Sequence, residues 1–276
     1  MMAPLLAEAA ARLAAAGVDS PRVDAELLLA ALLGVPRSRL LTAAAPPASV
    51  REEYARWVGR RVAREPLQHI TGVAWFRHVE LAVGPGVFVP RPETELLVDA
   101  VLPHLRGIER PAVVDLCSGS GGLAVAIADE VPGAAVVAVE HSAAALRYLA
   151  RNAEGTGVRV VAGDVGDPEL LRALYGQADA VVANPPYVPL PTDVAPEVLA
   201  DPREAVFAGA DGLELLPTVI TRAALLLRRG GVFAVEHDDT HQPAVVGLLA
   251  DSGEWTGVEP RRDLAGRARY VVATRG

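Results

Sequence analysis

The feature that most constrains the fold is a regular alternation of short apolar runs and helical patterns after Pro90. Apolar runs of strand length occur at Ala112–Leu116, Ala135–Val139, Val158–Ala162, Ala178–Ala183, Val232–Val235 and Arg269–Ala273. Helical patterns separate several of them, at Gly121–Glu130, Ala143–Ala153 and Pro217–Leu227. Such alternation is typical of βαβ units, in which a mostly parallel sheet carries helices on both faces. The sequence therefore predicts an α/β domain over residues 91–276.

The first 65 residues have a different pattern, which predicts a small helical bundle. Three helices are expected, at Pro4–Ala16, from Ser20-Pro21 to about Gly34, and from Ser49 to about Arg64. Serine followed by proline suits a helix N-terminus, and Ser49 with Glu52 has the spacing of a capping box. Such a bundle either docks a partner or serves only as a packing appendage.

Residues 66–90 predict a β-hairpin that links the two domains. Val73–Val83 alternates as a strand does, and Gly84-Pro85-Gly86 is a turn sequence. Val87–Val89 would then return as the second strand of the hairpin.

Charge and apolar runs limit the classes of partner. The formal net charge is −8, and residues 1–75 hold nine arginines against seven acidic residues, so the acidic excess lies in the remainder. Neither part contains a basic tract, which disfavours direct binding to nucleic acid. Apolar stretches such as Leu27–Leu33 are too short to span a bilayer, and no basic segment precedes the first helix as in a secretory signal. We therefore expect a cytoplasmic protein without a membrane partner.

Several chemistries are excluded by residue types that are rare or missing. All 26 basic residues are arginine, so no lysine is present for a Schiff base, pyridoxal phosphate or a P-loop. Cys117 is the single cysteine, which excludes an intramolecular disulfide and a cysteine-rich zinc site. His237 and His241 follow a predicted strand and not a continuous helix, so no metal site is expected there. The arginines near the C-terminus, which we interpret as a solvated face or a docking patch, are Arg261, Arg262, Arg267 and Arg269.

A glycine-rich loop follows the first strand of the α/β domain. It runs from Asp115 to Gly122 as Asp-Leu-Cys-Ser-Gly-Ser-Gly-Gly and opens the next helix. Glycines at such a turn let the backbone approach a ligand. Glu140 ends the next strand, where a carboxylate would accept hydrogen bonds from ribose hydroxyls. Two cofactors fit this pattern, a dinucleotide and S-adenosylmethionine. The Asp-x-x-x-Gly-x-Gly form resembles the loop of S-adenosylmethionine-dependent methyltransferases and matches the dinucleotide fingerprint poorly.

Two residues near this loop bear on the cofactor prediction. Asp164, in Gly163-Asp164-Val165 after the third strand, could approach the exocyclic amine of an adenine. Cys117 stands where many methyltransferases have the first glycine. No base is evident beside Cys117, so we interpret it as a small residue in a tight turn and not as a catalytic thiol.

A second motif, Asn184-Pro185-Pro186-Tyr187, follows the fourth strand at the carboxyl edge, where open α/β sheets bind ligands. The two prolines restrict the loop and hold Asn184 in one conformation. The Asn184 side-chain oxygen and the backbone carbonyl of Asn184 or Pro185 can each accept one hydrogen of an NH2 group, which fixes a weakly nucleophilic planar nitrogen. Tyr187 offers a flat face to the planar group. The motif predicts N-methylation, with Asn184, Pro185 and Tyr187 as catalytic residues.

The Asn-Pro-Pro-Tyr motif is shared by adenine-N6 DNA methyltransferases, some RNA guanine methyltransferases and protein glutamine methyltransferases. Two further blocks discriminate among them, Pro66–Gly72 and Val89–Glu95. Together with Asp201–Ala205, Gly209–Leu213 and Asp263–Arg267, they resemble the release factor glutamine methyltransferases, the bacterial family often called PrmC or HemK. The resemblance covers nearly the whole chain.

The resemblance implies a Rossmann-like class I methyltransferase domain at residues 91–276, a helical domain at residues 1–65 that docks a peptide chain release factor, and a hairpin linker at residues 66–90. The substrate would be the glutamine of the factor's Gly-Gly-Gln loop, with S-adenosylmethionine as methyl donor. Residues at the cofactor would be Cys117, Ser118, Gly119, Ser120, Gly121, Glu140, Asp164, Val165 and Asn184. Residues at the glutamine would be Asn184, Pro185, Pro186 and Tyr187.

The match to this family has one departure, because Val165 stands where a bulkier aromatic residue is often found. Pro90–Glu95 would shape the methionine end of the cofactor pocket. Two other classes stay open from the motifs alone. One is a nucleic-acid methyltransferase with the same chemistry, which would need a basic recognition region. The other is a binding protein that kept the methyltransferase fold.

Overall fold

The structure is a computed structural model that describes residues 2–276, and the chain divides into two compact units. The first unit extends to Val73 and also includes Val194–Ala200. The second unit contains Ala74–Asp193 and Asp201–Gly276. The short segment 194–200 therefore clusters with the helical residues, although it comes from the middle of the α/β sequence.

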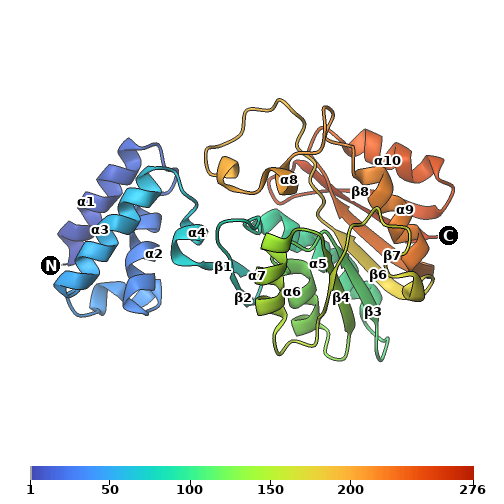
Figure 1. The fold of residues 1–276 in the computed structure, drawn as a ribbon, viewed down its shortest axis with the longest axis horizontal. Coiled ribbons are helices and arrows are strands. Elements are labelled where there is room, and N and C mark those ends of the chain that lie inside the picture. The colour runs from blue at the N-terminus through green and yellow to red at the C-terminus, as the bar shows by residue number, and fades with distance from the viewer. Residues whose placement is uncertain (1) are drawn as a thin grey trace. The chain divides into compact units, whose positions relative to one another are not determined.

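The first unit is a helical bundle with its own hydrophobic core (Figure 1). Its elements are α1 (Met2–Ala15), α2 (Pro21–Leu33), a 3-10 helix (Arg37–Thr42), α3 (Ala48–Val62) and α4 (Leu67–Thr71). The predicted end of α2 is confirmed, because Gly34 caps it in the left-handed conformation with a φ of 63°. The predicted capping box is wrong. Pro47 takes the N-cap position in an extended conformation, so Ser49 lies inside the first turn of α3 and no side chain caps it.

Buried ion pairs join α2, α3 and residues 194–200 within this unit. Arg61 is 7% exposed, and its guanidinium binds Asp24 and Glu197, both at 2.7 Å. Arg64 binds the same Glu197 carboxylate at 2.6 Å. Hydrogen bonds from Arg64 and Arg61 lower the pKa of Glu197 to about 2. The charged carboxylate therefore ties the segment 194–200 to α3.

The predicted hairpin is present, but its turn was predicted at the wrong place. β1 (Val73–Phe76) pairs with β2 (Val79–Ala82), and Val87–Val89 is not a strand. The chain turns at Arg77, which has a φ of 51° and is held by carboxylates of the α/β domain, and not at Gly84-Pro85-Gly86. The alternation changes phase at this turn, where Arg77 and His78 are two adjacent polar residues, and buried positions shift from Ala74 and Phe76 to Leu81.

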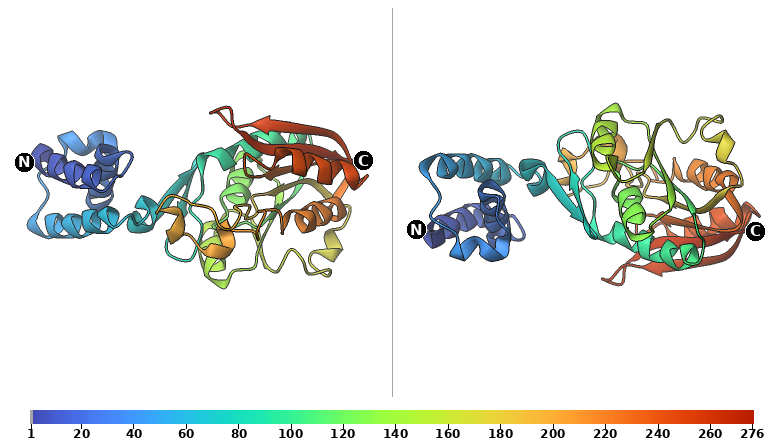
Figure 2. Two further views of the ribbon diagram at one scale, coloured as in Figure 1. Left: turned by 90° about the horizontal axis from the view of Figure 1, so that it is seen from above. Right: turned by 90° about the horizontal axis from the view of Figure 1, so that it is seen from below.

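The second unit is built on a seven-stranded sheet with the order β5-β4-β3-β6-β7-β9-β8 (Figure 1). Its strands are β3 (Ala112–Leu116), β4 (Ala135–Glu140), β5 (Arg159–Ala162), β6 (Ala178–Ala183), β7 (Leu227–Glu236), β8 (Trp255–Arg262) and β9 (Ala268–Arg275). Neighbours from β5 to β7 pair in parallel, whereas β9 is antiparallel to β7 and β8. The mostly parallel sheet is confirmed. The pattern did not predict β8, which forms an edge hairpin with β9 (Figure 2).

Helices cover both faces of this sheet. The helices of the unit are α5 (Glu95–Leu105), α6 (Gly122–Glu130), α7 (Ala143–Ala153), α8 (Arg203–Val206), α9 (Leu216–Leu226) and α10 (Gln242–Asp251). α5, α6 and α7 share one hydrophobic core with alternate strand residues, and α9 and α10 share the other. This two-sided burial explains why the strands are almost uniformly apolar. Among residues 2–276, no helix is long and apolar enough to cross a membrane.

The strand order reverses at β3, which lies between β4 and β6. Leu116, the last residue of β3, is in register with Val139 of β4 and Ala183 of β6. Open α/β sheets bind ligands at the carboxyl ends of the strands beside such a reversal. The glycine-rich loop, Glu140 and Asn184 follow or end these three strands, so the fold brings both predicted motifs to one edge.

Candidate active site

The glycine-rich loop crosses from β3 to α6 through three left-handed residues. Cys117, Gly119 and Gly121 have φ values of 61°, 56° and 92°. A side chain at Gly121 would come within 2.6 Å of Leu149, so close packing requires glycine there. Among residues 2–276, nothing lies within 4 Å of a Cβ built on Gly119. The backbone at Gly119 is therefore open to a ligand, while Gly121 faces the core.

Glu140 is bonded directly to this loop. Its Oε2 accepts the Gly119 N–H at 2.8 Å, and its Oε1 accepts the N–H groups of His141 and Ser142 at 2.8 and 2.7 Å. Three of the roughly four lone-pair positions of a carboxylate are thus used by the backbone. Glu140 shapes the loop and keeps one acceptor position for a hydroxyl group.

Asp115 is fully buried where the loop begins, and Cys117 is a partly buried residue of the loop. Asp115 Oδ2 accepts the Ala124 N–H at 3.2 Å, and Oδ1 has no hydrogen-bond partner among the described residues. Burial raises the pKa of Asp115 to about 7, and the charge of Glu140 adds to the shift. Burial, with the neighbouring carboxylates, also raises the pKa of Cys117. The thiol therefore stays protonated at neutral pH, which agrees with its interpretation as a small turn residue.

Asp164 and Val165 follow β5, and their side chains have different surroundings. Asp164 is exposed, and its Oδ1 accepts the Gly166 N–H at 2.7 Å. Val165 is buried in the hydrophobic core that includes α9, and its carbonyl accepts from Arg222 Nε at 3.1 Å. Of these two predicted cofactor residues, Asp164 is accessible to solvent, whereas Val165 is packed into the hydrophobic core.

The motif Asn184–Tyr187 leaves the end of β6 and is anchored at both ends. Asn184 Nδ2 donates to Thr94 Oγ1 at 3.0 Å, and Thr94 belongs to a short 3-10 helix before α5. The Tyr187 hydroxyl donates to Glu236 Oε1 at 2.8 Å, at the end of β7. Pro185 is buried and Pro186 is half-buried between them. The structure therefore holds the predicted catalytic residues against two elements that the motif itself does not reveal.

Glu236 is 1% exposed, and its carboxylate is the buried acidic group that holds the Tyr187 hydroxyl. Burial raises its pKa, whereas hydrogen bonds with Thr94 and Tyr187 and the charge of Arg269 oppose the rise. Burial and the Glu236 carboxylate raise the pKa of Tyr187, so its phenol stays protonated. The side chain of Arg269 is 11% exposed and lies 3.5 Å from Asp263. The interpretation of Arg269 as part of a solvated face is therefore wrong, because β9 places it among buried carboxylates.

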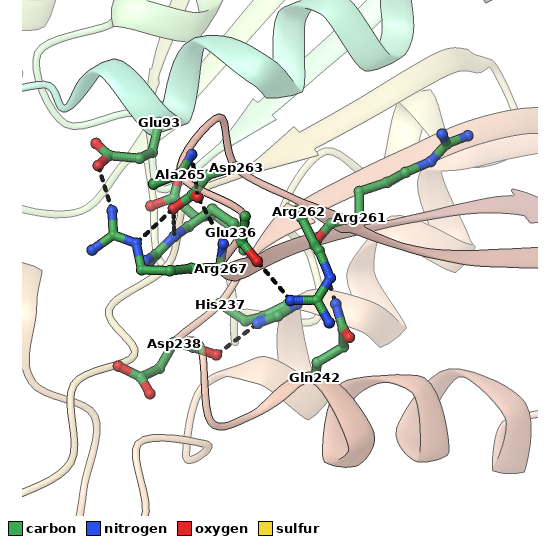
Figure 3. A network of polar contacts seen from close by, with 12 residues as sticks. Glu93, Glu236, His237, Asp238, Gln242, Arg261, Arg262, Asp263, Ala265 and Arg267 are labelled. Carbon is green, nitrogen blue, oxygen red and sulfur yellow. Dashed lines mark hydrogen bonds and ion pairs between the residues drawn. The ribbon is translucent and has the colours of Figure 1, made fainter.

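The turn between β8 and β9 is organised by Asp263 (Figure 3). Its carboxylate accepts the N–H groups of Ala265 and Arg267 and the Nε of Arg267, each at 2.9 Å. Arg267 also pairs with Glu93 at 3.0 Å, next to Thr94 in the chain. Through Arg267, the C-terminal motif therefore stabilises the segment that contains Thr94, the hydrogen-bond partner of Asn184.

The segment before Thr94 is fixed by Asp201. Arg91 Nη2 donates to Asp201 Oδ2 at 2.6 Å, and the Val89 N–H donates to Oδ1 at 3.2 Å. The Arg91 guanidinium also lies 4.9 Å from the centre of the Phe88 ring. Burial raises the pKa of Asp201 to about 6. Two of the blocks that carried the family resemblance, Val89–Glu95 and Asp201–Ala205, are thus bonded to each other.

The donor set suits a nucleoside cofactor. The open backbone at Gly119 allows close approach, the free acceptor position of Glu140 matches a ribose hydroxyl, and the exposed Asp164 lies after the neighbouring strand. Asn184 presents its amide at the same sheet edge. The arrangement can hold a cofactor beside a planar NH2 group.

Comparison with known proteins decides the family. A model of the PrmC N-terminal domain matches residues 4–72, and a model of the methyltransferase small domain matches residues 79–205. The release factor glutamine methyltransferase of Mycolicibacterium smegmatis is 48% identical over 97% of this chain and 95% of its own. That of Streptomyces coelicolor is also 48% identical, over 97% and 96%. This chain belongs to the release factor glutamine methyltransferase family.

Similarity extends to methyltransferases with other substrates. A 4-amino-L-phenylalanine/4-methylamino-L-phenylalanine methyltransferase of Streptomyces pristinaespiralis is 41% identical over 94% of this chain and 91% of its own. The solved structure of a Thermus thermophilus 16S rRNA N2 G1207 methyltransferase, with AdoMet and guanosine, covers 74% of this chain and 50% of that one with a TM-score of 0.52. At 23% identity that likeness concerns the fold alone.

Three residues of the candidate site, Thr94, Glu236 and Arg269, were not singled out as site residues in the sequence-based prediction. Thr94 stands inside the block Val89–Glu95, and Glu236 ends a strand at the carboxyl edge as Glu140 does. Those two positions carried a usable signal. Arg269 had none, because its surroundings depend on the antiparallel pairing of β9 with β7.

Proposed function

We propose that this enzyme methylates the side-chain amide nitrogen of the glutamine in the Gly-Gly-Gln motif of peptide chain release factors, with S-adenosylmethionine as methyl donor. The observation that carries the proposal is the anchored Asn184–Tyr187 motif. It occurs in a chain that is 48% identical, over nearly its full length, to relatives named release factor glutamine methyltransferase.

In this proposal the motif prepares a poor nucleophile for attack. Asn184 Oδ1 accepts one hydrogen of the substrate amide, and the backbone carbonyl of Asn184 or Pro185 accepts the other. The nitrogen is then held in place, and positive charge that develops on it during transfer is stabilised by these oxygens. Tyr187 packs its ring against the planar amide. The methylated nitrogen is strongly acidic and loses its proton to solvent, so no dedicated base is needed.

The cofactor would be held by the residues of the loop and by the ends of the neighbouring strands. Glu140 would bind a ribose hydroxyl, Asp164 the adenine amine, and the loop Cys117–Gly121 the rest of the nucleoside, with Val165 and Asn184 at its two sides. Bound there, S-adenosylmethionine supplies a methyl group on a positively charged sulfur. An affinity for S-adenosylmethionine without affinity for nicotinamide dinucleotides would support this assignment in calorimetry.

We further propose that residues 1–65 dock the release factor, that residues 66–90 link the domains, and that residues 91–276 perform the transfer. A small amide pocket cannot distinguish one exposed glutamine from another, so other contacts must supply the discrimination. The enzyme would then work in the cytoplasm on protein, without direct contacts to nucleic acid or membrane. Removal of residues 1–65, with folding checked, should impair methylation of the intact factor far more than cofactor binding.

The direct test is intact-mass analysis of purified release factors after incubation with the enzyme and S-adenosylmethionine. The expected result is the gain of one methyl group, mapped by peptide sequencing to the Gly-Gly-Gln glutamine. Two controls are matched to it, a release factor with that glutamine replaced by alanine and the enzyme variant Asn184→Ala. Methylation that is absent, or that persists at another residue in the first control, would refute the proposal.

A second candidate substrate is a small aromatic amine. It is favoured by the relative named 4-amino-L-phenylalanine/4-methylamino-L-phenylalanine methyltransferase, which is 41% identical. An aromatic amine also carries a planar NH2 group with a delocalised lone pair, so the same motif could hold it. The two candidates are separated by comparing kcat/KM for a release factor and for 4-amino-L-phenylalanine, and a larger value for the amino acid would favour the second.

A further inference from the structure

Thr94 binds Asn184 and lies near the buried carboxylate of Glu236. Asn184 Nδ2 donates to Thr94 Oγ1 at 3.0 Å, and Thr94 is 5% exposed. Glu236 Oε1 accepts the Tyr187 hydroxyl at 2.8 Å. Among the described residues, Glu236 Oε2 is buried without a hydrogen-bond partner, and the nearby Thr94 hydroxyl lowers the pKa of this carboxylate. Tyr187 is therefore bonded to a carboxylate that water does not reach, and Asn184 is bonded to a hydroxyl near the open acceptor oxygen of that carboxylate.

The chemistry of these groups gives this series of hydrogen bonds a direction. An ionised carboxylate only accepts hydrogen bonds, and a threonine hydroxyl has a single hydrogen to donate. If Thr94 gives that hydrogen to Glu236, it can only accept from Asn184. Asn184 must then turn its NH2 group inward to Thr94 and its Oδ1 outward.

We propose that Thr94 and Glu236 are positioning residues, which orient the Asn184 amide so that its oxygen and not its nitrogen faces the substrate nitrogen. An amide has nearly the same shape in its two flipped orientations, so packing alone selects weakly between them. A flipped Asn184 would point N–H donors at a substrate group that itself offers two N–H donors. The nature of that substrate rests on the proposed function, whereas the orientation of Asn184 does not.

The charges around Glu236 shift its pKa in opposite directions. Arg269 supplies the nearest positive charge, and Glu93 opposes it. Asp263 lies 3.5 Å from Arg269 and shares its charge, and His237 is the next residue along the chain. The Tyr187 hydroxyl donates to Oε1, and Oε2 is an open acceptor among the described residues. The local arrangement thus offers the Thr94 hydrogen a buried acceptor.

Thr94→Val is the primary test, because valine keeps the shape and removes the hydroxyl. It should lower kcat by roughly 10- to 100-fold, less than the loss of Asn184 itself, with little change in KM. Thr94→Ser keeps the hydroxyl and should restore most of the turnover. Thr221→Val removes an exposed hydroxyl that is bonded to Pro217 O in α9, and it serves as the matched control.

Glu236→Gln separates orientation from stability. Glutamine can donate its N–H to Thr94, which frees the Thr94 hydrogen for Asn184 Oδ1. The direction of these hydrogen bonds is then reversed. The expected result is a lower kcat at an unchanged or higher melting temperature, because a buried charge is removed. A role that is only structural predicts the opposite, a lower melting temperature with proportionate loss of activity.

A measurement on the free enzyme needs no substrate. The chain contains two asparagines, Asn152 and Asn184, so asparagine-selective labelling gives two side-chain amide groups by NMR. Asn152 is an internal control, since its Nδ2 donates to Ala82 O at 3.0 Å and to Ser120 O at 2.9 Å. One Asn184 amide hydrogen should exchange slowly in the wild type and in Thr94→Ser, and quickly in Thr94→Val.

Equal exchange of the Asn184 amide in the wild type and Thr94→Val would overturn the proposal. So would wild-type turnover in Thr94→Val, or a loss in Thr94→Ser as large as that in Thr94→Val. If the wild type does not methylate release factors, the proposed function fails, and amide exchange still decides whether Thr94 orients Asn184.

Discussion

Gly212 should prove essential to the position of Tyr187, although it lies outside the motif. Gly212 has a φ of 73°, and a Cβ on it would collide with the Tyr187 carbonyl oxygen and lie 2.6 Å from Cε1 of His241 and 3.1 Å from Pro189. Backbone and proline atoms have little freedom to move away. Gly212→Ala should therefore displace the Asn184–Tyr187 motif as well as strain its own backbone.

The size of the effect follows from a matched control, Gly253, which has a φ of 69°. No described residue lies within 4 Å of its Cβ position. Gly253→Ala should lower the free energy of unfolding by about 1–2 kcal/mol, the cost of a left-handed alanine. Gly212→Ala adds overpacking and should cost roughly 2–5 kcal/mol. A displacement of about 1 Å at the reacting group lowers turnover by roughly 10²-fold.

The assay combines chemical unfolding with steady-state methyl transfer for both variants at a temperature where both are folded. The expected result is a large fall in kcat for Gly212→Ala and near wild-type kcat for Gly253→Ala. If both variants lose the same free energy of unfolding and both keep wild-type kcat, the close approach of Gly212 to Tyr187 does not affect turnover.

Four further outcomes are expected. Asn184→Ala should lower kcat by about 10²–10³ with little change in release factor affinity, measured by kinetics and by binding titration. Glu140→Ala should weaken S-adenosylmethionine binding by roughly 1–3 kcal/mol in calorimetry, and unchanged affinity would contradict its assignment. Arg61→Met should lower the free energy of unfolding by about 3–5 kcal/mol, because it leaves the buried Asp24 carboxylate without its ion-pair partner while Glu197 keeps only Arg64. Loss of the exposed Arg22–Glu26 pair should cost only about 0.3–0.5 kcal/mol. Burial raises the pKa of Asp115 from 3.8 to about 7, so folding favours its protonated form. Its contribution to stability is present below the ordinary pKa and is lost as the pH rises through the raised one, so the melting temperature of the wild type should fall relative to Asp115→Asn over that range.

Much of the α/β architecture is determined by local sequence. The bounds of β3, β6 and α7 coincide with the predicted Ala112–Leu116, Ala178–Ala183 and Ala143–Ala153. Strands covered on both faces need uninterrupted apolar runs, and helices between them need a different period, so the pattern carries the information directly. The glycine-rich loop and the Asn184–Tyr187 motif were equally visible, because each is a short continuous segment whose residue types follow from its chemistry.

Local pattern was insufficient where a turn or a segment depended on distant partners. The hairpin turn at Arg77 is held by carboxylates of the α/β domain, and the segment 194–200 clusters with the helical unit through Glu197. Neither contact is encoded in the residues adjacent to it. The capping box failed for a local reason, since Pro47, two residues before Ser49, takes the extended N-cap position.

Only the tertiary structure determines which residues hold Asn184 and Tyr187 in place. Thr94 lies 90 positions before Asn184, and Glu236 lies 49 positions after Tyr187. They meet because β6 and β7 are neighbours in the sheet and the 3-10 helix before α5 reaches the same edge. The motif specifies which atoms can hold a substrate nitrogen, but the direction of a side-chain amide is set by hydrogen-bond partners, and those partners come together only when the sheet has formed.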